Sequence, residues 1–180
     1  VVTGPNQTAQ TADLYFNKID SVKNADGSNT YRFTLTSADS NAAASIVHKF
    51  TVKPDDYMIE FDVDLTGADK LLTQGNLNLT WQYAAAQQES DIDFEKQNTQ
   101  VGYVTDGEFD YHTISKTDDK DFNKSVKWIG VRQRFFFTIL RADKNFSNGK
   151  MEWSIPADSA KTLVQSTANM KVQLPVGPTA

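Results

Sequence analysis

The sequence contains no cysteine and no long apolar run, and each absence excludes a class of protein. Without cysteine among its 180 residues, the chain has no disulfide, no thiolate nucleophile and no cysteine-containing zinc site. No apolar run approaches the ~20 residues that a membrane-spanning helix needs, and the amino terminus lacks the basic and hydrophobic segments of a signal peptide. We therefore expect either a soluble protein or an excised piece of a larger one.

Charge and composition point to an ordinary globular chain. Eighteen basic and 23 acidic residues give a net charge of -5, and no Lys/Arg cluster is suited to follow a phosphate backbone, so nucleic acid is not an expected partner. A chain of this length can bury a substantial core. We expect a single domain over residues 1–180, with loose ends at 1–12 and 175–180.

Alternating apolar and polar residues recur along the chain, as in strands with one buried face. The pattern covers residues 31–36, 57–65, 77–83, 151–155 and 170–174. Turn chemistry separates the strand-like segments, at Asp26-Gly27, Pro54-Asp55-Asp56, Asp106-Gly107 and Asn148-Gly149. The sequence therefore predicts an all-β, largely antiparallel fold with less than about a fifth of its residues in helices.

Helical propensity is confined to two short segments. Tyr83 to Lys96, with its Ala-Ala-Ala-Gln-Gln-Glu centre, predicts either a helix or a long loop that carries one or two helical turns. Asp158 to Gln165 is a weaker candidate. At most short helices are expected.

The most apolar stretch of the chain runs from Ile129 to Leu140. Its nearly continuous apolar residues are typical of a strand that is covered on both sides. Because the stretch exceeds the usual strand of about 5 to 6 residues, we expect a bulge or bend near Gly130 or Gln133. With an unbroken register, Phe135 and Phe137 are buried on the same face as Gln133, whose amide then needs hydrogen-bond partners.

Two histidines are the first candidates for acid–base chemistry. His48 shares a strand face with apolar residues, which favours a packed, hydrogen-bonded side chain. His112 lies at the end of the Asp106-Gly107 hairpin, where a general base could lie. No carboxylate at a diagnostic spacing accompanies it, so a solvated strand position is favoured.

Acidic segments at Asp91–Glu95 and Asp118–Asp121 are the candidates for a cation site. Neither fits an EF-hand loop, which needs a glycine at its turn and a glutamate at its twelfth position, so solvated loop charges are expected. The sequence also lacks a Gly-x-Ser-x-Gly elbow and a glycine-rich phosphate loop. No catalytic, cofactor-binding or metal-binding residue is therefore predicted.

Aromatic residues are plentiful, with 11 Phe, 6 Tyr and the three tryptophans Trp81, Trp128 and Trp153. Aromatic rings could form the floor of a sugar-binding cleft. Most of these residues lie on the apolar sides of the predicted strands, so core packing is the favoured explanation for the majority.

A series of short motifs keeps a fixed order along about residues 11–176: Thr11–Phe16, Tyr31–Thr36, Phe50–Tyr57, Ile59–Leu65, Leu79–Trp81, Lys127–Ile129 with Gln133 and Phe135-Phe136, and Ala168–Val172. The order resembles that of the periplasmic domain of the YidC membrane protein insertases, in the form found in Bacteroidetes. Each motif alone is weak; their order and the central run carry the resemblance.

The resemblance implies a fold, a location and partners. The implied fold is an antiparallel β-supersandwich related to galactose mutarotases, which lies in the periplasm between the first and second transmembrane helices of an inner-membrane protein. The implied partners are Sec translocon subunits, nascent inner-membrane proteins and the protein's own transmembrane domain. The polar groove of the membrane part has no matching positions here, so no functional residue is carried over, and the chain is expected to be a truncated fragment.

Two functions therefore remain open. The first is a non-catalytic domain that assists the insertion and folding of membrane proteins, alone or with the Sec translocon. The second is a mutarotase-like domain that binds or epimerises carbohydrate, which needs a cleft with a positioned acid and base. Fold alone does not decide between them; the ordered motifs and the lack of an acid–base pair favour the first.

Overall fold

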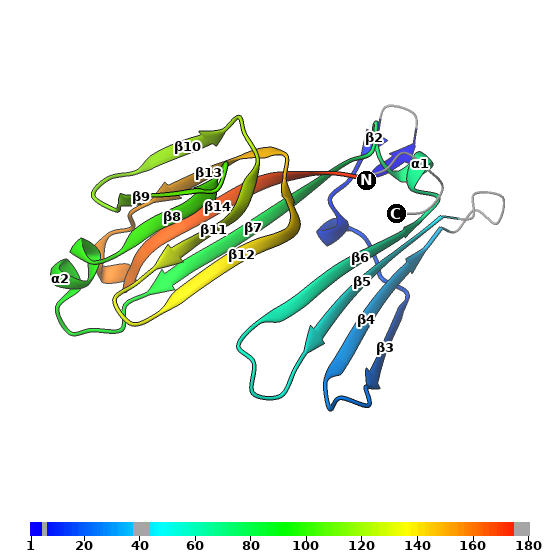
Figure 1. Cartoon of the computed structure of the whole chain (residues 1–180), viewed down its shortest axis with the longest axis horizontal. Coiled ribbons are helices and arrows are strands. Elements are labelled where there is room, and N and C mark those ends of the chain that lie inside the picture. The colour runs from blue at the N-terminus through cyan, green and yellow to red at the C-terminus, as the bar shows by residue number, and fades with distance from the viewer. Residues whose placement is uncertain (5–6, 38–43, 175–180) are drawn as a thin grey trace. The chain divides into compact units, whose positions relative to one another are not determined.

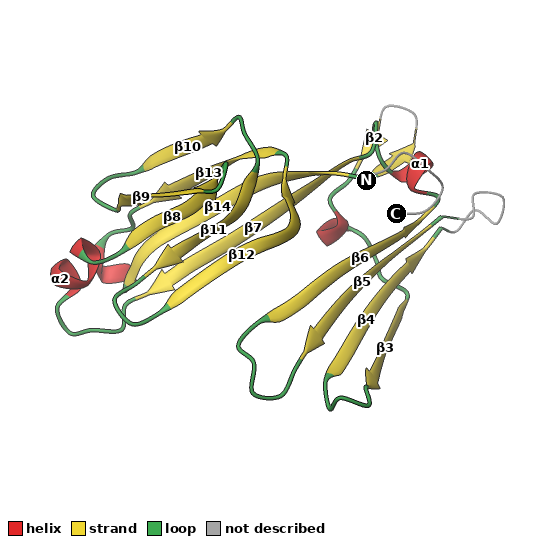
Figure 2. Ribbon diagram, viewed as in Figure 1, coloured by secondary structure: helices red, strands yellow, loops and turns green. Residues whose placement is uncertain are grey.

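The computed structural model describes residues 1–4, 7–37 and 44–174 and consists mainly of β-strands (Figures 1 and 2). Three four-stranded sheets and one two-stranded sheet occur in this part of the chain. Its helical segments are short: α1 (Ala68–Leu71), α2 (Ile92–Gln97) and the 3-10 turns Thr11–Asp13 and Asp158–Ala160. The prediction of a mainly antiparallel β-fold with short helices is confirmed.

The chain divides into two compact units. Unit 1 comprises Val1–Asn76 and Leu174–Ala180, and unit 2 comprises Leu77–Gln173, so that unit 2 is inserted between two segments of unit 1. Where the chain returns to unit 1, the backbone N–H of Leu174 donates a hydrogen bond to the carbonyl of Gly75 at 2.9 Å. The expectation of one domain over residues 1–180 stays a prediction, and residues 175–180 lie outside the described part.

Unit 1 is built around one antiparallel sheet whose strands follow in chain order. These strands are β3 (Lys18–Lys23), β4 (Asn29–Thr36), β5 (Ser45–Val52) and β6 (Ile59–Thr66). The β3–β4 and β5–β6 turns contain the predicted Asp26-Gly27 and Pro54-Asp55-Asp56 signals, and Gly27 and Asp55 adopt positive φ angles of 87° and 57°. Near the amino terminus, β1 (Val2–Gly4) pairs with β2 (Gln7–Thr8).

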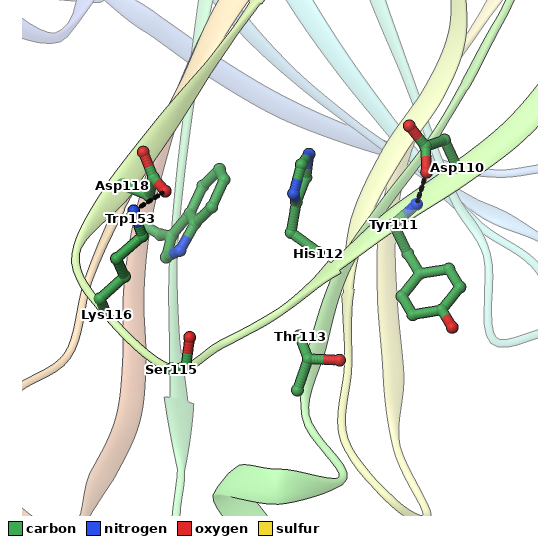
Figure 3. Close-up of a pocket in the computed structure, with 8 residues that line it drawn as sticks. All are labelled: Asp110, Tyr111, His112, Thr113, Ser115, Lys116, Asp118 and Trp153. Atoms are coloured by element: carbon green, nitrogen blue, oxygen red, sulfur yellow. Dashed lines mark hydrogen bonds and ion pairs between the residues drawn. The ribbon is translucent and has the colours of Figure 1, made fainter.

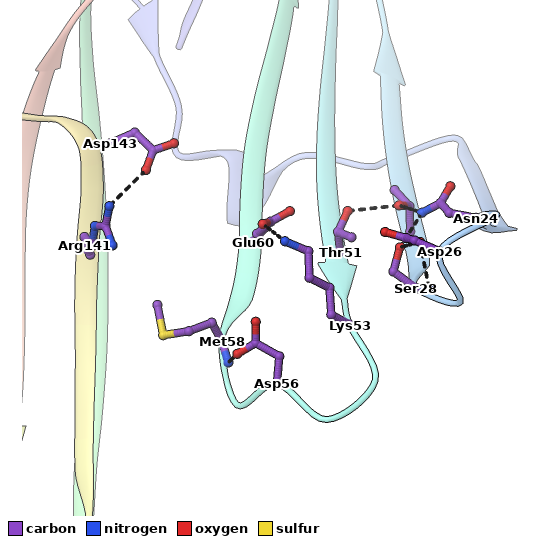
Figure 4. Close-up of polar contacts among 11 residues, drawn as sticks. Asn24, Asp26, Ser28, Thr51, Lys53, Asp56, Met58, Glu60, Arg141 and Asp143 are labelled. Carbon is purple, nitrogen blue, oxygen red and sulfur yellow. Dashed lines mark hydrogen bonds and ion pairs between the residues drawn. The ribbon is translucent and has the colours of Figure 1, made fainter.

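Polar side chains brace the ends of this sheet (Figure 4). In the β3–β4 turn, the N–H and hydroxyl of Ser28 donate to Asp26 at 3.0 and 2.7 Å, and these hydrogen bonds hold the pKa of Asp26 below its ordinary value. Asn24 donates its side-chain amide to the Ser28 hydroxyl at 2.8 Å. Lys53, which directly follows β5, forms an ion pair with Glu60 of β6.

Unit 2 contains two four-stranded sheets that share one hydrophobic core. The first has the order β12-β11-β8-β9, with β8 (Gln100–Thr105), β9 (Glu108–Thr113), β11 (Val126–Arg132) and β12 (Phe137–Phe146). The second has the order β10-β13-β14-β7, with β7 (Asn76–Ala86), β10 (Asp118–Phe122), β13 (Asn148–Ser154) and β14 (Thr162–Gln173). Buried residues of both sheets, such as Ile129, Tyr103, Met151 and Leu163, belong to one cluster, as in a β-sandwich.

The apolar run from Ile129 to Leu140 is a hairpin, and the expectation of one long, doubly covered strand is wrong. β11 ends at Arg132, residues 133–136 form the turn, and β12 begins at Phe137 opposite Arg132. The backbone N–H of Gln133 closes the turn on the carbonyl of Phe136 at 2.7 Å. The bend expected near Gln133 is thus a complete reversal of the chain.

This reversal also overturns the expected burial of Phe135 and Phe137. Phe135 is 69% exposed and Phe137 is 52% exposed. Phe135 lies in the turn, and Phe137 lies opposite Arg132, which alternates with the buried residues Ile129 and Val131 and faces away from the core. Gln133 is buried as expected.

Two other local expectations differ from the structure. The segment Tyr83–Lys96 continues β7 as far as Ala86 and becomes helical only in α2, so the alternative of a loop with one or two helical turns is the closer one. Asn148-Gly149 is not a turn but lies in β13. A side chain on Gly149 would place its Cβ 2.6 Å from the carbonyl oxygen of Asn169, so this glycine permits the close approach of β14.

Candidate functional site

A surface pocket of about 520 Å³ in unit 2 is the strongest candidate for a functional site (Figure 3). It is formed by β9, by the segment that leads to β10, and by β13. Mostly polar side chains line it: Asp110, Tyr111, His112, Thr113, Ser115, Lys116, Asp118 and Trp153. The chemistry available to the pocket depends on His112 and the two carboxylates.

Strand alternation and register bring Asp110, His112 and Tyr103 together. Asp110 and His112 are two residues apart on β9, so they point to the same side of the sheet. Tyr103 of β8 lies directly opposite Asp110 in the register of the two strands. The Tyr103 hydroxyl lies 2.9 Å from Oδ2 of Asp110 and 3.0 Å from Nε2 of His112.

The single proton of the Tyr103 hydroxyl decides the direction of its hydrogen bonds with Asp110 and His112. The hydroxyl donates to Asp110, which leaves its oxygen free to accept from Nε2 of His112. Burial, together with the hydrogen bond to Asp110, raises the pKa of Tyr103, so the phenol remains protonated at neutral pH. The same hydrogen bond, with the backbone N–H of Tyr111, lowers the pKa of Asp110.

The second carboxylate of the pocket is held in a similar way. Asp118 accepts a hydrogen bond from the backbone N–H of Asp119 at 3.0 Å and forms an ion pair with Lys116 at 3.1 Å. These contacts lower its pKa, the backbone hydrogen bond most strongly. Both pocket carboxylates are therefore ionised at neutral pH, and neither is a proton donor for general acid catalysis.

Trp153 forms part of the pocket wall but offers little open ring surface. It is 4% exposed and belongs to the core of unit 2. The imidazole of His112 lies with its ring centre 5.6 Å from that of Trp153, at an interplanar angle of 30°. The indole therefore packs against protein on the side where a sugar ring would stack.

Replacing Tyr103 by Phe should raise the pKa of Asp110 towards the ordinary value of about 3.9 for an aspartate. The folded-state pKa of Asp110 lies below its unfolded value, so its stabilising contribution is present above the unfolded pKa and is lost as pH falls through the folded pKa. A carboxyl carbon NMR titration measures the shift directly. Asp118, which does not contact Tyr103, should keep its pKa, and an unchanged Asp110 would contradict the arrangement.

The two histidines differ from each other in their surroundings. His48 packs in unit 1 between Phe16 and Phe61, with ring centres 4.9 and 5.4 Å away, and burial lowers its pKa. The packed environment expected for His48 is thus found. The expectation for His112 is wrong, because the residue is half-buried and is linked through Tyr103 to the carboxylate of Asp110.

The acidic segment Asp91–Glu95 also departs from its expected exposure. Asp91 caps α2 by accepting from the N–H of Phe94 at 2.9 Å. Glu95 is 1% exposed, and its Oε2 accepts from the backbone N–H groups of Gln88 and Glu89 at 2.9 and 3.0 Å. The expectation of a solvated charge is therefore wrong for Glu95, which holds the loop that precedes α2.

Gln133 extends this buried network to the β11–β12 turn. Its side-chain amide donates to the carbonyl of Ala86 at 2.8 Å and to Oε1 of Glu95 at 3.2 Å. The hydroxyl of Tyr83 lies 3.5 Å from its carbonyl oxygen. The partners expected for a buried Gln133 are thus present, and the network joins β7, α2 and the turn.

The roles of Tyr103, Asp110 and Glu95 were not predicted from the sequence. The signal for the first two was weak but present: Asp-x-His within one strand places both side chains on one face. Their contact with Tyr103 depends on the register of β8 and β9, which the Asp106-Gly107 turn restricts. Nothing local distinguishes Glu95 from its exposed neighbour Asp93.

Residues 1–4, 7–37 and 44–174 contain no group of three or more His, Asp or Glu side chains arranged to hold a metal ion. No helix of sufficient length and hydrophobicity to cross a membrane occurs in the same ranges.

Exposed aromatic residues are more numerous than expected. Half of the 20 aromatic side chains are exposed, so core packing does not account for the majority: Tyr15, Tyr31, Tyr57, Phe61, Phe94, Phe109, Tyr111, Phe135, Phe136 and Phe137. Some line up on unit 2, where Phe109 lies 5.9 Å from Tyr111 and 5.8 Å from Trp128 between ring centres. Such a surface is typical of an interaction site.

Comparison with known proteins gives one consistent result. The family model described as the YidC periplasmic domain matches residues 1–179. A membrane protein insertase YidC from Parabacteroides distasonis is 27% identical over 178 residues, which cover 97% of this chain and 27% of that protein.

Two further relatives bear the same name. The protein from Bacteroides fragilis is 32% identical over 140 residues, covering 76% of this chain and 21% of the relative. The protein from Porphyromonas gingivalis is 27% identical over 177 residues, covering 96% of this chain and 27% of the relative. The chain thus spans about a quarter of the length of the relatives it matches.

Proposed function

The chain belongs to the YidC periplasmic domain family, and on that basis we propose that it is an accessory domain that assists the insertion and folding of inner-membrane proteins. Membership places it in the periplasm, as a domain of an inner-membrane insertase and within a non-catalytic family. The relatives extend well beyond this chain, which spans about a quarter of their length. What this domain contributes to the activity of the whole insertase is therefore a proposal.

The family match carries this proposal, and the state of the pocket carboxylates bears on its catalytic alternative. Asp110 and Asp118 each have both oxygens engaged by hydrogen bonds or an ion pair, and both have lowered pKa values. A sugar epimerase needs one group that gives a proton and another that takes it near neutral pH. Because both carboxylates are held ionised by their neighbours, neither of them can be the proton donor of such a pair.

The carbohydrate-binding alternative is less well supported. His112 covers the indole of Trp153, and Trp153 is itself almost completely buried. Carbohydrate sites usually present an open aromatic face beside their hydrogen-bonding groups. One exposed aromatic residue, Tyr111, lines the pocket, whereas other exposed rings of unit 2, such as Phe109, Phe135 and Phe136, do not.

The proposed partners are nascent inner-membrane proteins, Sec translocon subunits and the transmembrane domain of the same insertase. Exposed apolar side chains support contacts of this kind, because large exposed aromatic residues are enriched at interaction surfaces. The finer fold assignment, a β-supersandwich of the galactose mutarotase type formed by residues 1–180 as one domain, rests on the family and on three four-stranded sheets.

Excision of unit 2 from the full-length insertase tests the accessory role. The hydrogen bond between Leu174 and Gly75 keeps the two ends of the excised segment close together, so a short Gly-Ser linker can replace residues 77–173. We expect the purified variant, reconstituted into lipid vesicles, to insert a single-span membrane protein at a measurable rate.

Vesicles without insertase are the negative control for this measurement, and vesicles with the unaltered protein are the positive control. Protease protection of the substrate reports insertion, and circular dichroism of the reconstituted variant confirms that its membrane helices are folded. If the folded variant inserts no more substrate than empty vesicles do, unit 2 takes a direct part in insertion and the accessory role is wrong.

A further inference from the structure

The β11–β12 turn has an inverted polarity. Gln133 is 3% exposed, whereas Phe135 and Phe136 of the turn and Phe137 at the start of β12 are 69%, 52% and 52% exposed; Arg134 is exposed as well. Surface turns normally expose polar residues and bury apolar ones. The connection between the two strands lies at one end of their sheet (Figure 1), and the three phenyl groups are exposed at this connection and at the start of β12.

The buried network fixes the turn in this orientation. Gln133 bonds through its backbone N–H to Phe136 and through its side chain to Ala86 and Glu95. Arg134 forms an ion pair with Glu89 at 2.9 Å. Because these bonds hold the turn from inside, exposing the phenyl groups requires no rearrangement of unit 2, and a binding partner would not have to order this segment.

Basic side chains accompany the exposed rings. The hairpin from Val126 to Phe146 contains five basic residues and one acidic residue, in a chain whose net charge is -5: Lys127, Arg132, Arg134, Arg141 and Lys144, with Asp143, which lies 3.9 Å from Arg141. The guanidinium of Arg134 lies over the rings of Phe94 and Phe135, at 5.1 and 4.8 Å from their centres.

Acidic groups also lie near the turn and reduce this local positive charge. Glu89 is paired with Arg134, and Asp91 and Asp93 are exposed on and beside α2. Arg132 is exposed and makes a hydrogen bond of 3.3 Å to the amide oxygen of Gln100. The cationic surface nearest the phenyl groups is therefore that of Arg132 and of the partly neutralised Arg134.

We propose that the β11–β12 turn binds the surface of a lipid bilayer that contains anionic phospholipid. Phe135 and Phe136 enter the boundary between headgroups and acyl chains, where aromatic rings are favoured, and Arg132 lies at the level of the lipid phosphates. Exposed phenyl rings beside an exposed arginine match the apolar and anionic layers of such a bilayer, whereas an apolar helical segment of a protein binds in a groove. The proposal goes beyond the accessory role and does not depend on it.

Binding of the 180-residue chain to vesicles tests the proposal. Vesicles of phosphatidylcholine with phosphatidylglycerol are compared with vesicles of phosphatidylcholine alone by co-sedimentation. The unaltered chain should bind the anionic vesicles more tightly. The double variant Phe135→Ser/Phe136→Ser should bind them at least about tenfold more weakly, because it loses two buried aromatic side chains. Arg132→Gln should weaken binding to the anionic vesicles alone, by about fivefold.

A matched control separates the turn from general surface hydrophobicity. The variant Tyr15→Ser/Tyr57→Ser removes two aromatic rings that are also exposed but belong to unit 1, and it should bind like the unaltered chain. Unchanged tryptophan fluorescence verifies that the variants of unit 2 are folded, because all three tryptophans lie in that unit. An unchanged circular dichroism spectrum verifies the folding of the Tyr15/Tyr57 control.

Three results would overturn the proposal. They are absence of vesicle binding by the unaltered chain, equal loss in the Tyr15/Tyr57 control, and binding of a permanently unfolded polypeptide, but not of vesicles, that requires Phe135 and Phe136. The last result would assign the turn to an apolar protein segment. None of these outcomes bears on the insertion assay, because the vesicle experiment contains no insertase.

Discussion

Replacing Phe146 by Ala should lower the free energy of unfolding of unit 2 by about 3 to 5 kcal/mol. Phe146 ends β12, is 2% exposed and belongs to the core shared by both sheets of the unit. Phe146 lies opposite the buried Val126 in the register of the hairpin. Truncation removes most of a large buried side chain and leaves a cavity that the surrounding strands fill only in part.

Phe135→Ala is the matched control on the same hairpin. Phe135 is exposed, so its loss should change the free energy of unfolding by no more than about 0.5 kcal/mol. Urea unfolding followed by tryptophan fluorescence is selective for unit 2, because Trp81, Trp128 and Trp153 all lie in it. Equal destabilisation by the two substitutions would show that the turn is packed against the core.

Replacing Glu95 by Ala should destabilise unit 2 by about 2 to 4 kcal/mol. The substitution removes the acceptor for two backbone N–H groups, those of Gln88 and Glu89, and for the side-chain amide of Gln133. Buried donors left without an acceptor cost free energy that the smaller side chain does not recover. The β11–β12 turn should also loosen, because Gln133 loses one of its anchors.

Two variants make this measurement specific. Asp93→Ala lies on the same short helix at an exposed position and should change stability by no more than about 0.5 kcal/mol. Glu95→Gln keeps one oxygen as an acceptor and should lie between Glu95→Ala and the unaltered protein. Hydrogen exchange at the amides of Gln88 and Glu89 checks the cause, and unchanged protection in Glu95→Ala would contradict it.

Much of the fold could be predicted from the sequence because the strands alternate strictly. The patterns around Tyr31 and Ile59 correspond to β4 and β6, in which one face is apolar and the other polar. Turn residues with positive φ, such as Gly27 and Gly107, marked two of the hairpins correctly. These signals depend on neighbouring residues alone, so they can be recognised without knowledge of the tertiary structure.

The β11–β12 hairpin could not be predicted from the sequence because its turn lacks the residues that are typical of turns. Residues 133–136, Gln-Arg-Phe-Phe, contain no Gly, Pro, Asn or Asp, and the flanking strands are apolar on both faces. Periodicity alone does not separate a hairpin of this composition from a buried strand. The conformation depends on tertiary hydrogen bonds from Gln133 to Ala86 and Glu95, residues far away in the sequence.

The candidate site was missed for a related reason. Tyr103 and Asp110 meet through strand register, and His112 meets Trp153 of another sheet through the packing of the sandwich. The sequence shows that these residues are present but does not give the distances between them. Their types were visible, but their association required the tertiary structure.

The insertion of unit 2 within unit 1 has a consequence for folding as the chain emerges during export. The sheet of unit 1 is a meander whose last strand ends at Thr66, so all four strands can pair before any residue of unit 2 is available. Unit 2 is one continuous segment and can then complete its own core. Only the short return segment at Leu174 must wait until unit 2 has emerged, so each unit can form most of its own strand pairings as soon as its residues are available.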